Sequence, residues 1–174
     1  MTADKIIEEL KLIPHPKEGG YFQEIYRSDE EIPGSALPQR YYGDNRSVST
    51  AIYFLLRGNT YSHFHRLESD EVFHFYDGMP LEIITLLPDG TGQSLILGRD
   101  LEKGERPLIV VPRGVWQALR LYDGGKGQSE DDYSLFGTTV APGFHYGDYE
   151  HGNRESLIAE YPEYKADIEL LTSR

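Results

Sequence analysis

Histidines and carboxylates are concentrated in one stretch of the chain, residues 58–78, which is bounded by two glycines and holds three of the six histidines. His63 and His65 are two residues apart, so on a β-strand both side chains would leave the same face. Glu71 follows a few residues later. An imidazole that titrates near neutral pH, next to a carboxylate, is suited to proton transfer or to binding a metal ion. This stretch is therefore the candidate functional site.

The segment that carries Glu71 also predicts an apolar wall beside the polar groups. Glu71, Phe73 and Phe75 alternate along the chain, so a strand would place a carboxylate at one end of an aromatic stripe. Trp116 and Gln117 come from a later apolar segment and are expected to line the same pocket. Gln117 is a candidate for ligand binding because an amide that faces an apolar interior needs hydrogen-bond partners.

The His65–Glu71 pair has two interpretations, and both stay open at this point. As functional groups, His65 is a base that is oriented by the Glu71 carboxylate. As structural groups, the two side chains form a hydrogen bond that satisfies two buried polar residues. His63 is expected to face the pocket with them, or to be solvated at the start of its strand.

The other histidines receive weaker assignments from the sequence. By strand alternation, His74 points away from Glu71 and packs or lies at an interface. His15 lies between two prolines and is expected to be a turn residue. The group His145, Tyr146 and Tyr149 follows the last strong strand signal and is a candidate cap for a pocket mouth.

Composition limits the class of protein. The 174 residues include no cysteine and carry a formal net charge of −12. The missing cysteines exclude disulfides and thiolate sites, and the negative charge disfavours nucleic acid as a partner. No apolar run approaches the roughly 20 residues of a membrane helix. A cytoplasmic protein that partners neither nucleic acid nor membrane is expected.

Turn-forming residues and short apolar runs predict an all-β fold. Roughly nine short strands follow one another with turn signals between them, and helices are expected only at the two ends. The polar segment 28–45 is predicted to be a long loop, either a lid over a site or a surface excursion.

Several motifs resemble those of the cupins. A His-x-His pair and a glutamate between two glycines, in residues 58–78, resemble the first cupin motif, and residues 104–114 resemble the second. More narrowly, residues 64–71, together with 14–22 and 140–144, resemble a small cupin family known as DUF985 or cupin-5.

The resemblance covers about residues 5–170 and implies a double-stranded β-helix, or jelly roll, with a pocket between its sheets. It implies one cupin domain over 1–174, with a core of about 20–145 and terminal helices at about 3–12 and 154–171. Members of the family are usually dimers, and relatives resemble sugar-nucleotide epimerases in shape. A homodimer is therefore expected.

The metal-ligand pattern of cupins is incomplete here. The spacing between His65 and Glu71 is one residue longer than usual, so that measured from Glu71 the second histidine position holds Leu67. Gln117 stands where the resemblance places the last histidine, and its neutral amide is a poor ligand for the metals that imidazole attracts. The sequence thus commits to no cofactor. A divalent metal on His63, His65 and Glu71 is the alternative.

Three functions follow, of which the first is preferred. It is the binding of a small polar or sugar-like molecule in the barrel, with epimerisation or isomerisation in which His65 and Glu71 are catalytic and a tyrosine, not identified by the sequence, returns the proton. The second is a metal-dependent oxygenase or isomerase, and the third is a non-catalytic ligand-binding module. The expected pocket residues are His63, Phe73, Phe75, Trp116 and Gln117.

Overall fold

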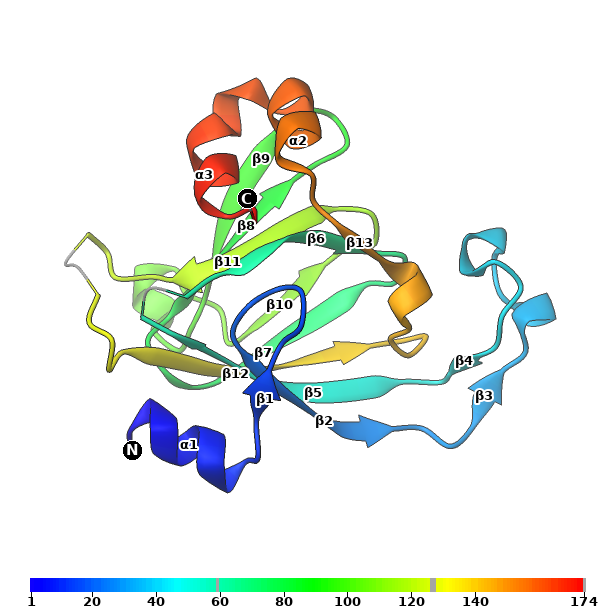
Figure 1. The fold of residues 1–174 in the computed structure, drawn as a ribbon, viewed down its shortest axis with the longest axis horizontal. Coiled ribbons are helices and arrows are strands. Elements are labelled where there is room, and N and C mark those ends of the chain that lie inside the picture. Colours follow the sequence, from blue (N-terminus) through cyan, green and yellow to red (C-terminus); the bar gives the residue numbers. More distant parts are fainter. Residues whose placement is uncertain (59, 126–127, 174) are drawn as a thin grey trace.

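Two antiparallel β-sheets face each other and enclose the interior of the protein, which is the predicted all-β double-stranded β-helix (Figure 1). The computed structural model describes residues 1–58, 60–125 and 128–173. Within these ranges the helices lie at the two ends of the chain, as expected from the sequence.

Each sheet combines strands that are far apart in the chain. The first sheet has the order β1 (Ile13–Pro14), β2 (Tyr21–Arg27), β5 (Thr50–Arg57), β12 (Tyr133–Val140), β7 (Glu71–Gly78) and β10 (Leu108–Val111). The second has the order β13 (Tyr149–His151), β6 (Ser62–Leu67), β11 (Trp116–Leu121), β8 (Leu81–Leu86) and β9 (Gly92–Leu97). A small ribbon pairs β3 (Glu31–Ile32) with β4 (Arg46–Ser47).

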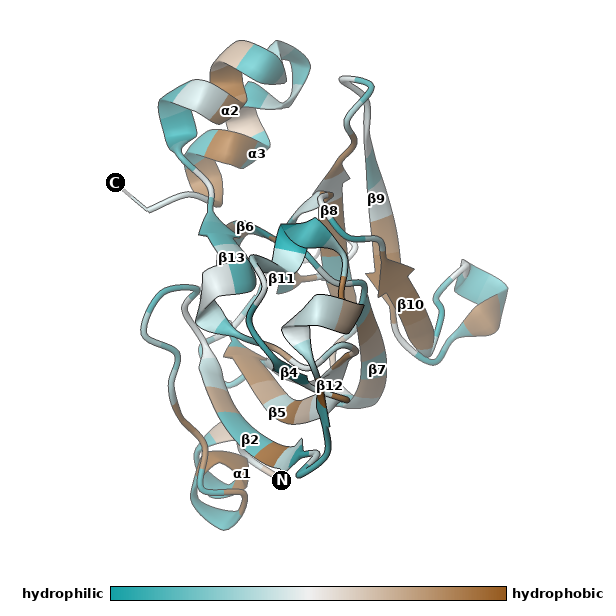
Figure 2. Ribbon diagram, turned by 90° about the vertical axis from the view of Figure 1, so that its right-hand side faces the viewer, coloured by the Kyte–Doolittle hydropathy of each residue, from teal (hydrophilic) through white to brown (hydrophobic). Residues whose placement is uncertain are grey.

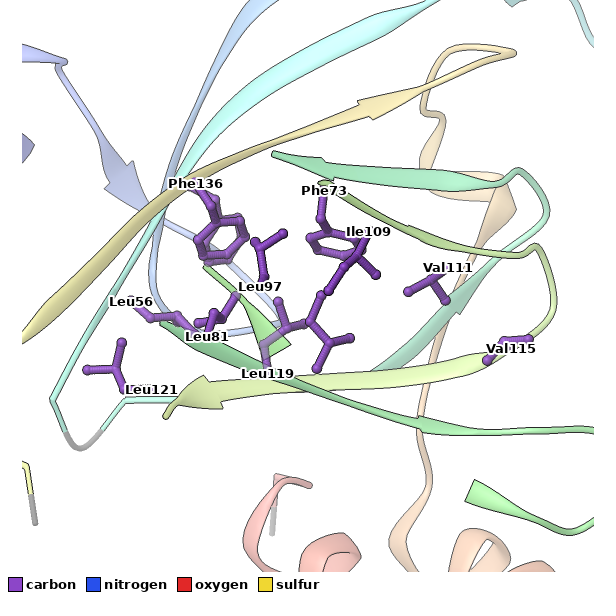
Figure 3. Packing of buried hydrophobic residues seen from close by; sticks show 12 residues of the cluster. Leu56, Phe73, Leu81, Leu97, Ile109, Val111, Val115, Leu119, Leu121 and Phe136 are labelled. Atoms are coloured by element: carbon purple, nitrogen blue, oxygen red, sulfur yellow. The ribbon is translucent and has the colours of Figure 1, made fainter. Parts of the chain in front are cut away.

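The central apolar cluster fills the space between the two sheets. Phe73 and Phe136 project from the first sheet toward Leu119 and Leu121 of the second (Figure 3). Hydrophobic stretches are concentrated in the strands that meet across this interior, whereas many connecting segments are hydrophilic (Figure 2). Removing one such leucine or phenylalanine side chain typically costs about 2–5 kcal/mol of stability, so this cluster fixes the distance between the sheets.

Helices cover the outside of the barrel. Helix α1 (Ala3–Glu9) is capped by Thr2 and is shorter than the predicted segment 3–12. Helix α2 (Arg154–Glu160) begins after Asn153, whose side chain accepts a hydrogen bond from the Ser156 amide at 3.0 Å, as the sequence predicts.

The rest of the predicted last helix is divided into the 3₁₀ turn η5 (Pro162–Tyr164) and helix α3 (Lys165–Leu170). Helices α2 and α3 pack on the outer face of the second sheet through a separate apolar cluster. No helix in the described ranges is long and apolar enough to cross a membrane.

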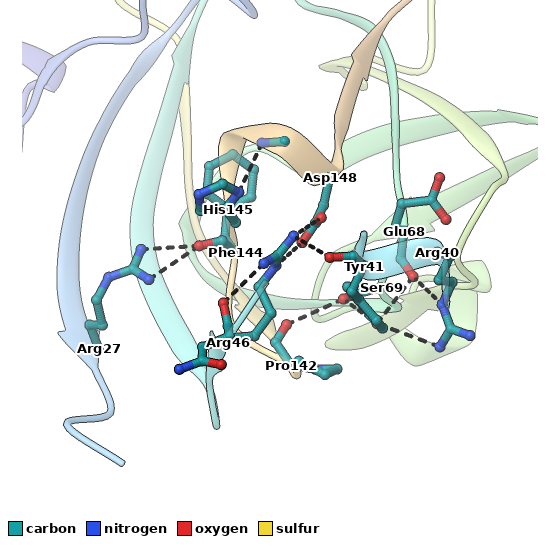
Figure 4. A network of polar contacts seen from close by, with 12 residues as sticks. Arg27, Arg40, Tyr41, Arg46, Glu68, Ser69, Pro142, Phe144, His145 and Asp148 are labelled. Atoms are coloured by element: carbon teal, nitrogen blue, oxygen red, sulfur yellow. Dashed lines mark hydrogen bonds and ion pairs between the residues drawn. The ribbon is translucent and has the colours of Figure 1, made fainter. Parts of the chain in front are cut away.

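The polar segment 28–45 is tied to the body of the protein rather than left as a free loop. It contains β3 and the 3₁₀ turns η1 (Gly34–Ala36) and η2 (Gln39–Tyr41). The Tyr41 side chain is buried, and its hydroxyl lies 2.9 Å from Ser69 Oγ. Just after the segment, Arg46 forms a buried two-bond ion pair with Asp148, of 2.6 and 2.7 Å (Figure 4). These contacts fix the segment against the loops that follow β6 and β12.

Candidate functional site

A cavity of about 460 Å³ lies between the sheets, above the central apolar cluster. Most of its wall is aromatic or aliphatic, and polar residues gather at its inner end and its mouth. Its lining residues include His15, Glu18, Phe22, Glu24, Arg27, Phe54, Ser62, His65, Glu71, Phe73, Phe136, His145 and Tyr146. A volume of this size is in the range of small-molecule sites.

His65 lies on β6 at the inner end of the cavity and is 3% exposed. Its Nδ1 lies 2.8 Å from the carbonyl oxygen of His63, which can only accept a hydrogen bond. The ring proton is therefore on Nδ1, and the Nε2 lone pair accepts from the side-chain amide of Gln117 at 3.2 Å. Burial lowers the pKa of His65, although the charge of Glu71 acts in the opposite direction. The imidazole is thus held neutral in one tautomer.

The Gln117 amide links His65 to Glu71. Its nitrogen also donates to Glu71 Oε2 at 2.5 Å, and the register pairs Gln117 directly with His65 across β6 and β11. Gln117 was predicted to line the pocket, but it is buried behind the cavity wall, and its Oε1 has no hydrogen-bond partner among the described residues. The sequence predicted that Glu71 itself would orient His65, but the hydrogen bonds pass through the amide. Burial raises the pKa of Glu71, with His65 opposing this effect.

Two further titratable groups come from the segment before β2 and are not predicted from the sequence. The Glu18 carboxylate accepts from Ser62 Oγ at 3.2 Å, and its Oε2 lies 3.8 Å from His65 Nε2. His15 Nδ1 accepts from the Glu18 backbone amide at 2.9 Å, and His15 Nε2 is 3.6 Å from Glu18 Oε1. Burial raises the pKa of Glu18 and lowers that of His15. The predicted turn at His15 is present, but its side chain lines the cavity.

A tight turn carries these residues over the end of β6. Gly19 has a φ of 93°, and a Cβ there would lie 2.4 Å from the Tyr61 carbonyl oxygen, so the position requires glycine. The Glu18 carbonyl accepts from the His63 amide at 2.8 Å. The prolines and glycines of residues 14–20 were the sequence signal that could have identified Glu18 and His15, because they mark a fixed turn that holds its side chains in place.

A β-bulge in β6 interrupts the regular alternation that predicted His63 and His65 together in the pocket. Gln117 pairs with His65, but Leu119 pairs with Ser62, so β6 has one more residue than β11 between these pairs. Ser62 lines the cavity with His65, whereas His63 does not line it, and the His63 ring lies 6.1 Å from the ring of His151. His63, His65 and Glu71 are not brought together as a metal-ligand set.

The donor groups that do reach the cavity fit a metal poorly. Within the described ranges, no three His, Asp or Glu side chains are placed to hold one ion. The Nε2 of His65, which would bind a metal, is occupied by the amide of Gln117, and that amide is itself a weak ligand. We therefore derive no chemical step through a metal.

Two predicted aromatic lining residues lie elsewhere. Trp116 points to the outer face of the second sheet, where it packs with α2 and α3 and lies 4.4 Å beneath the Arg66 guanidinium. This correction follows from alternation, because Gln117 faces inward and its neighbour must face outward. Phe75 packs against the central cluster but does not line the cavity. Phe73 does line the cavity, as predicted.

The segment after β12 forms part of the cavity mouth. His145 and Tyr146 line the cavity, and Arg27 from β2 donates to the Phe144 carbonyl at 3.2 Å on the same side (Figure 4). Tyr149 stacks on the His65 ring at a centroid distance of 5.4 Å, and burial raises its pKa. All residues of segment 28–45 are described and none lines the cavity, so this structure does not show the segment as a lid.

The two facing antiparallel sheets, with a histidine and a glutamate at the wall of the cavity between them, are those of a cupin. The chain belongs to the Cupin superfamily (DUF985), whose family model matches residues 4–152. An uncharacterized protein of Saccharomyces cerevisiae is 29% identical over 177 residues, which cover 98% of this chain and 86% of the yeast protein.

Solved structures agree with this assignment. A hypothetical protein from Leishmania major is 30% identical, with a TM-score of 0.87 and complete coverage of both chains. A Shewanella oneidensis protein is 36% identical, with a TM-score of 0.84 and coverage of 99% of this chain and 98% of its own. Oxalate decarboxylase from Bacillus subtilis is 15% identical, with a TM-score of 0.51, and 92% of this chain matches 37% of it. That last likeness concerns the fold alone.

Proposed function

We propose that the cavity binds a small molecule with an apolar body and a polar end, and that His65 and Glu71 move a proton on it, as in an epimerase or isomerase. The observation that carries this proposal is the arrangement at the inner end. A neutral histidine and a carboxyl group are buried at the wall of a ligand-sized cavity and are joined by an amide. Titratable groups with shifted pKa values in a cavity are typical of acid–base sites.

The hydrogen bonds support a role for His65 as the base. The His63 carbonyl fixes its proton on Nδ1, so Nε2 carries the lone pair. Once the Gln117 amide that donates to Nε2 turns away, this lone pair can take a proton from a carbon next to a carbonyl. Glu18 Oε2, 3.8 Å from Nε2, would stabilise the imidazolium that forms. Rotation of the Gln117 amide would bring its unpartnered Oε1 to the new Nε2–H.

The same rotation involves Glu71. Once Gln117 Oε1 occupies the position of the amide nitrogen, Glu71 has to donate rather than accept. The raised pKa of Glu71 favours the protonated form that this requires. For the return of the proton, Tyr146 is the tyrosine that lines the cavity in the described part of the chain, whereas Tyr149 lies against His65.

Deuterium incorporation tests the proton-transfer step and does not require the ligand to be identified first. Wild-type protein is incubated in D₂O with a pool of small cell metabolites, and mass spectrometry is used to search for compounds that gain one deuterium. We expect such a compound with the wild type. Incorporation should be slower by about tenfold or more with Glu71→Gln, which corresponds to about 1.4 kcal/mol, because an amide cannot take up or release a proton as a carboxyl group does.

His74→Gln is the matched control, because His74 lies on the same strand and bonds Thr139 at 3.1 Å outside the cavity. Its rate should equal that of the wild type. If no compound gains deuterium in a protein-dependent manner, proton transfer is excluded and a non-catalytic binding module is left.

We also propose that the protein is a cytoplasmic homodimer. Support comes from the exposed apolar side chains of the edge strand β10, where Leu108 is 51% and Val110 48% exposed. Edge strands of this kind are usually covered. Sedimentation velocity at micromolar concentration should give a single dimeric species, and a purely monomeric profile would contradict the proposal.

A further inference from the structure

On the assumption that the cavity is a binding site, we propose that its ligand is an amine, whose ammonium group lies between Glu18 and Glu71 and whose body contacts the phenylalanine rings. This deepens the proposed function by naming the chemical class of the ligand. It depends on the charges, hydrogen bonds and rings that face the cavity.

Among the described lining residues, the inner end of the cavity has two carboxyl groups and no arginine or lysine beside them. Glu18 is 9% and Glu71 8% exposed, and both line the cavity. Among the described lining residues, Arg27 is the one arginine or lysine. Its guanidinium is bound to both Glu24 oxygens, at 3.0 and 2.7 Å, and to the Phe144 carbonyl at the mouth. Arg27 therefore does not balance the two inner carboxyl groups.

The histidines do not supply the missing charge. His65 accepts from Gln117 at Nε2, so it is neutral. His15 accepts from the Glu18 amide at Nδ1, which leaves one proton, on the Nε2 that faces Glu18 Oε1. Burial disfavours a second proton on either ring. Two buried carboxyl groups thus share the cavity without a cation beside them. Burial favours their protonated forms, and a bound ammonium group would stabilise them as an ionised pair.

An ammonium group matches this end in charge and in hydrogen bonding. It has three N–H donors and no acceptor, so one group can donate to both carboxylates. Aromatic rings add a favourable interaction with a cation, and Phe22, Phe54 and Phe73 line the same cavity. A ligand carboxylate or phosphate would find no positive side chain at this end, and its charge would oppose the ionisation of both glutamates. An alcohol would donate one hydrogen bond and leave the charges unbalanced.

Three probes of the same shape test the proposal by isothermal titration calorimetry on the full chain. They are 2-phenylethylamine, 2-phenylethanol and 3-phenylpropionate, which share a ring and a short chain and differ in the charge of the end group. We expect the amine to bind at least about tenfold more tightly than the alcohol, which corresponds to about 1.4 kcal/mol. The carboxylate should bind more weakly than the alcohol.

Variants test whether Glu18 and Glu71 bind the amine. Glu18→Gln and Glu71→Gln should each weaken amine binding by about tenfold or more while changing alcohol binding by less than about twofold. Glu150→Gln is the control, since Glu150 pairs with Arg66 on the outer surface at 2.7 Å and should leave amine binding unchanged. Thermal melting confirms that each variant is folded, and the comparison of the three probes needs only the wild type.

The outcomes separate the ligand class from the site. Alcohol or carboxylate binding as tight as that of the amine would show that the cavity binds small molecules but has no preference for amines, which overturns the proposal alone. Amine binding that neither Glu18→Gln nor Glu71→Gln weakens would also overturn it. If the amine fails to bind at millimolar concentration, the ligand class is wrong, and the deuterium experiment still decides separately on proton transfer.

Discussion

Arg46→Met is expected to lower the free energy of unfolding by about 3–5 kcal/mol, because it removes one partner of a buried ion pair and leaves the other charge behind. Arg46 and Asp148 are 2% and 4% exposed at their side chains, and two hydrogen bonds join them. Asp148 ends the 3₁₀ turn η4 (Tyr146–Asp148), whose first residue lines the cavity mouth. The loss should therefore also loosen the mouth. Urea unfolding followed by tryptophan fluorescence measures the effect.

A double variant shows whether the loss of stability comes from the missing attraction or from the unpaired charge left on Asp148. Arg46→Met combined with Asp148→Leu should recover most of the stability, since apolar residues can replace a buried pair at little cost. Lys165→Met breaks the exposed pair with Glu169, whose atoms are 3.7 Å apart, and should cost less than about 0.5 kcal/mol. A loss below about 1 kcal/mol for Arg46→Met would mean that water reaches Asp148 and that the pair is not buried in solution.

The sequence predicted the architecture, and the positions of Glu71 and Phe73 at the cavity wall, because these depend on regular patterns. Short apolar runs between turn residues identified the strands, and the cupin resemblance arranged them in a jelly roll that the structure and the relatives confirm. Alternation also placed Glu71 and Phe73 correctly, since β7 is regular there and its register with β10 is continuous.

The errors arise where the backbone departs from the regular pattern or where distant segments meet. The bulge in β6 interrupts the alternation between Ser62 and His65, His63 does not line the cavity, and no residue type in this stretch marks the bulge. The prediction that Trp116 lines the cavity beside Gln117 was wrong because adjacent strand residues face opposite ways. Glu18 and His15 reach the site through a turn that contacts β6. Such a contact between separate parts of the chain leaves no periodic signal in the sequence.

Glu71→Gln is expected to stabilise the protein at neutral and alkaline pH, and the gain should disappear in acid. Burial raises the pKa of Glu71 above its ordinary value of 4.5, so the folded state binds the proton more tightly than the unfolded state. The free energy of unfolding of the wild type therefore falls as the pH rises from about 4.5 through the raised pKa. The Glu71→Gln variant has no such loss. Each unit of pKa shift contributes about 1.4 kcal/mol. Urea unfolding of both proteins across this pH range measures the difference.

Two further variants test the direction in which stability changes with pH. Glu18→Gln should behave as Glu71→Gln does, because burial also raises the pKa of Glu18. Asp77→Asn should behave in the opposite way. The Tyr133 hydroxyl donates to Asp77 at 2.7 Å and lowers the pKa of that carboxyl. The wild type should therefore be more stable than Asp77→Asn at neutral pH, and this difference should be lost as the pH falls through the lowered pKa. If Glu71→Gln destabilises the protein at pH 8, the carboxylate is ionised and stabilising. The cavity would then already hold a positive charge near Glu71, and it would not need the positive charge that the amine is proposed to supply.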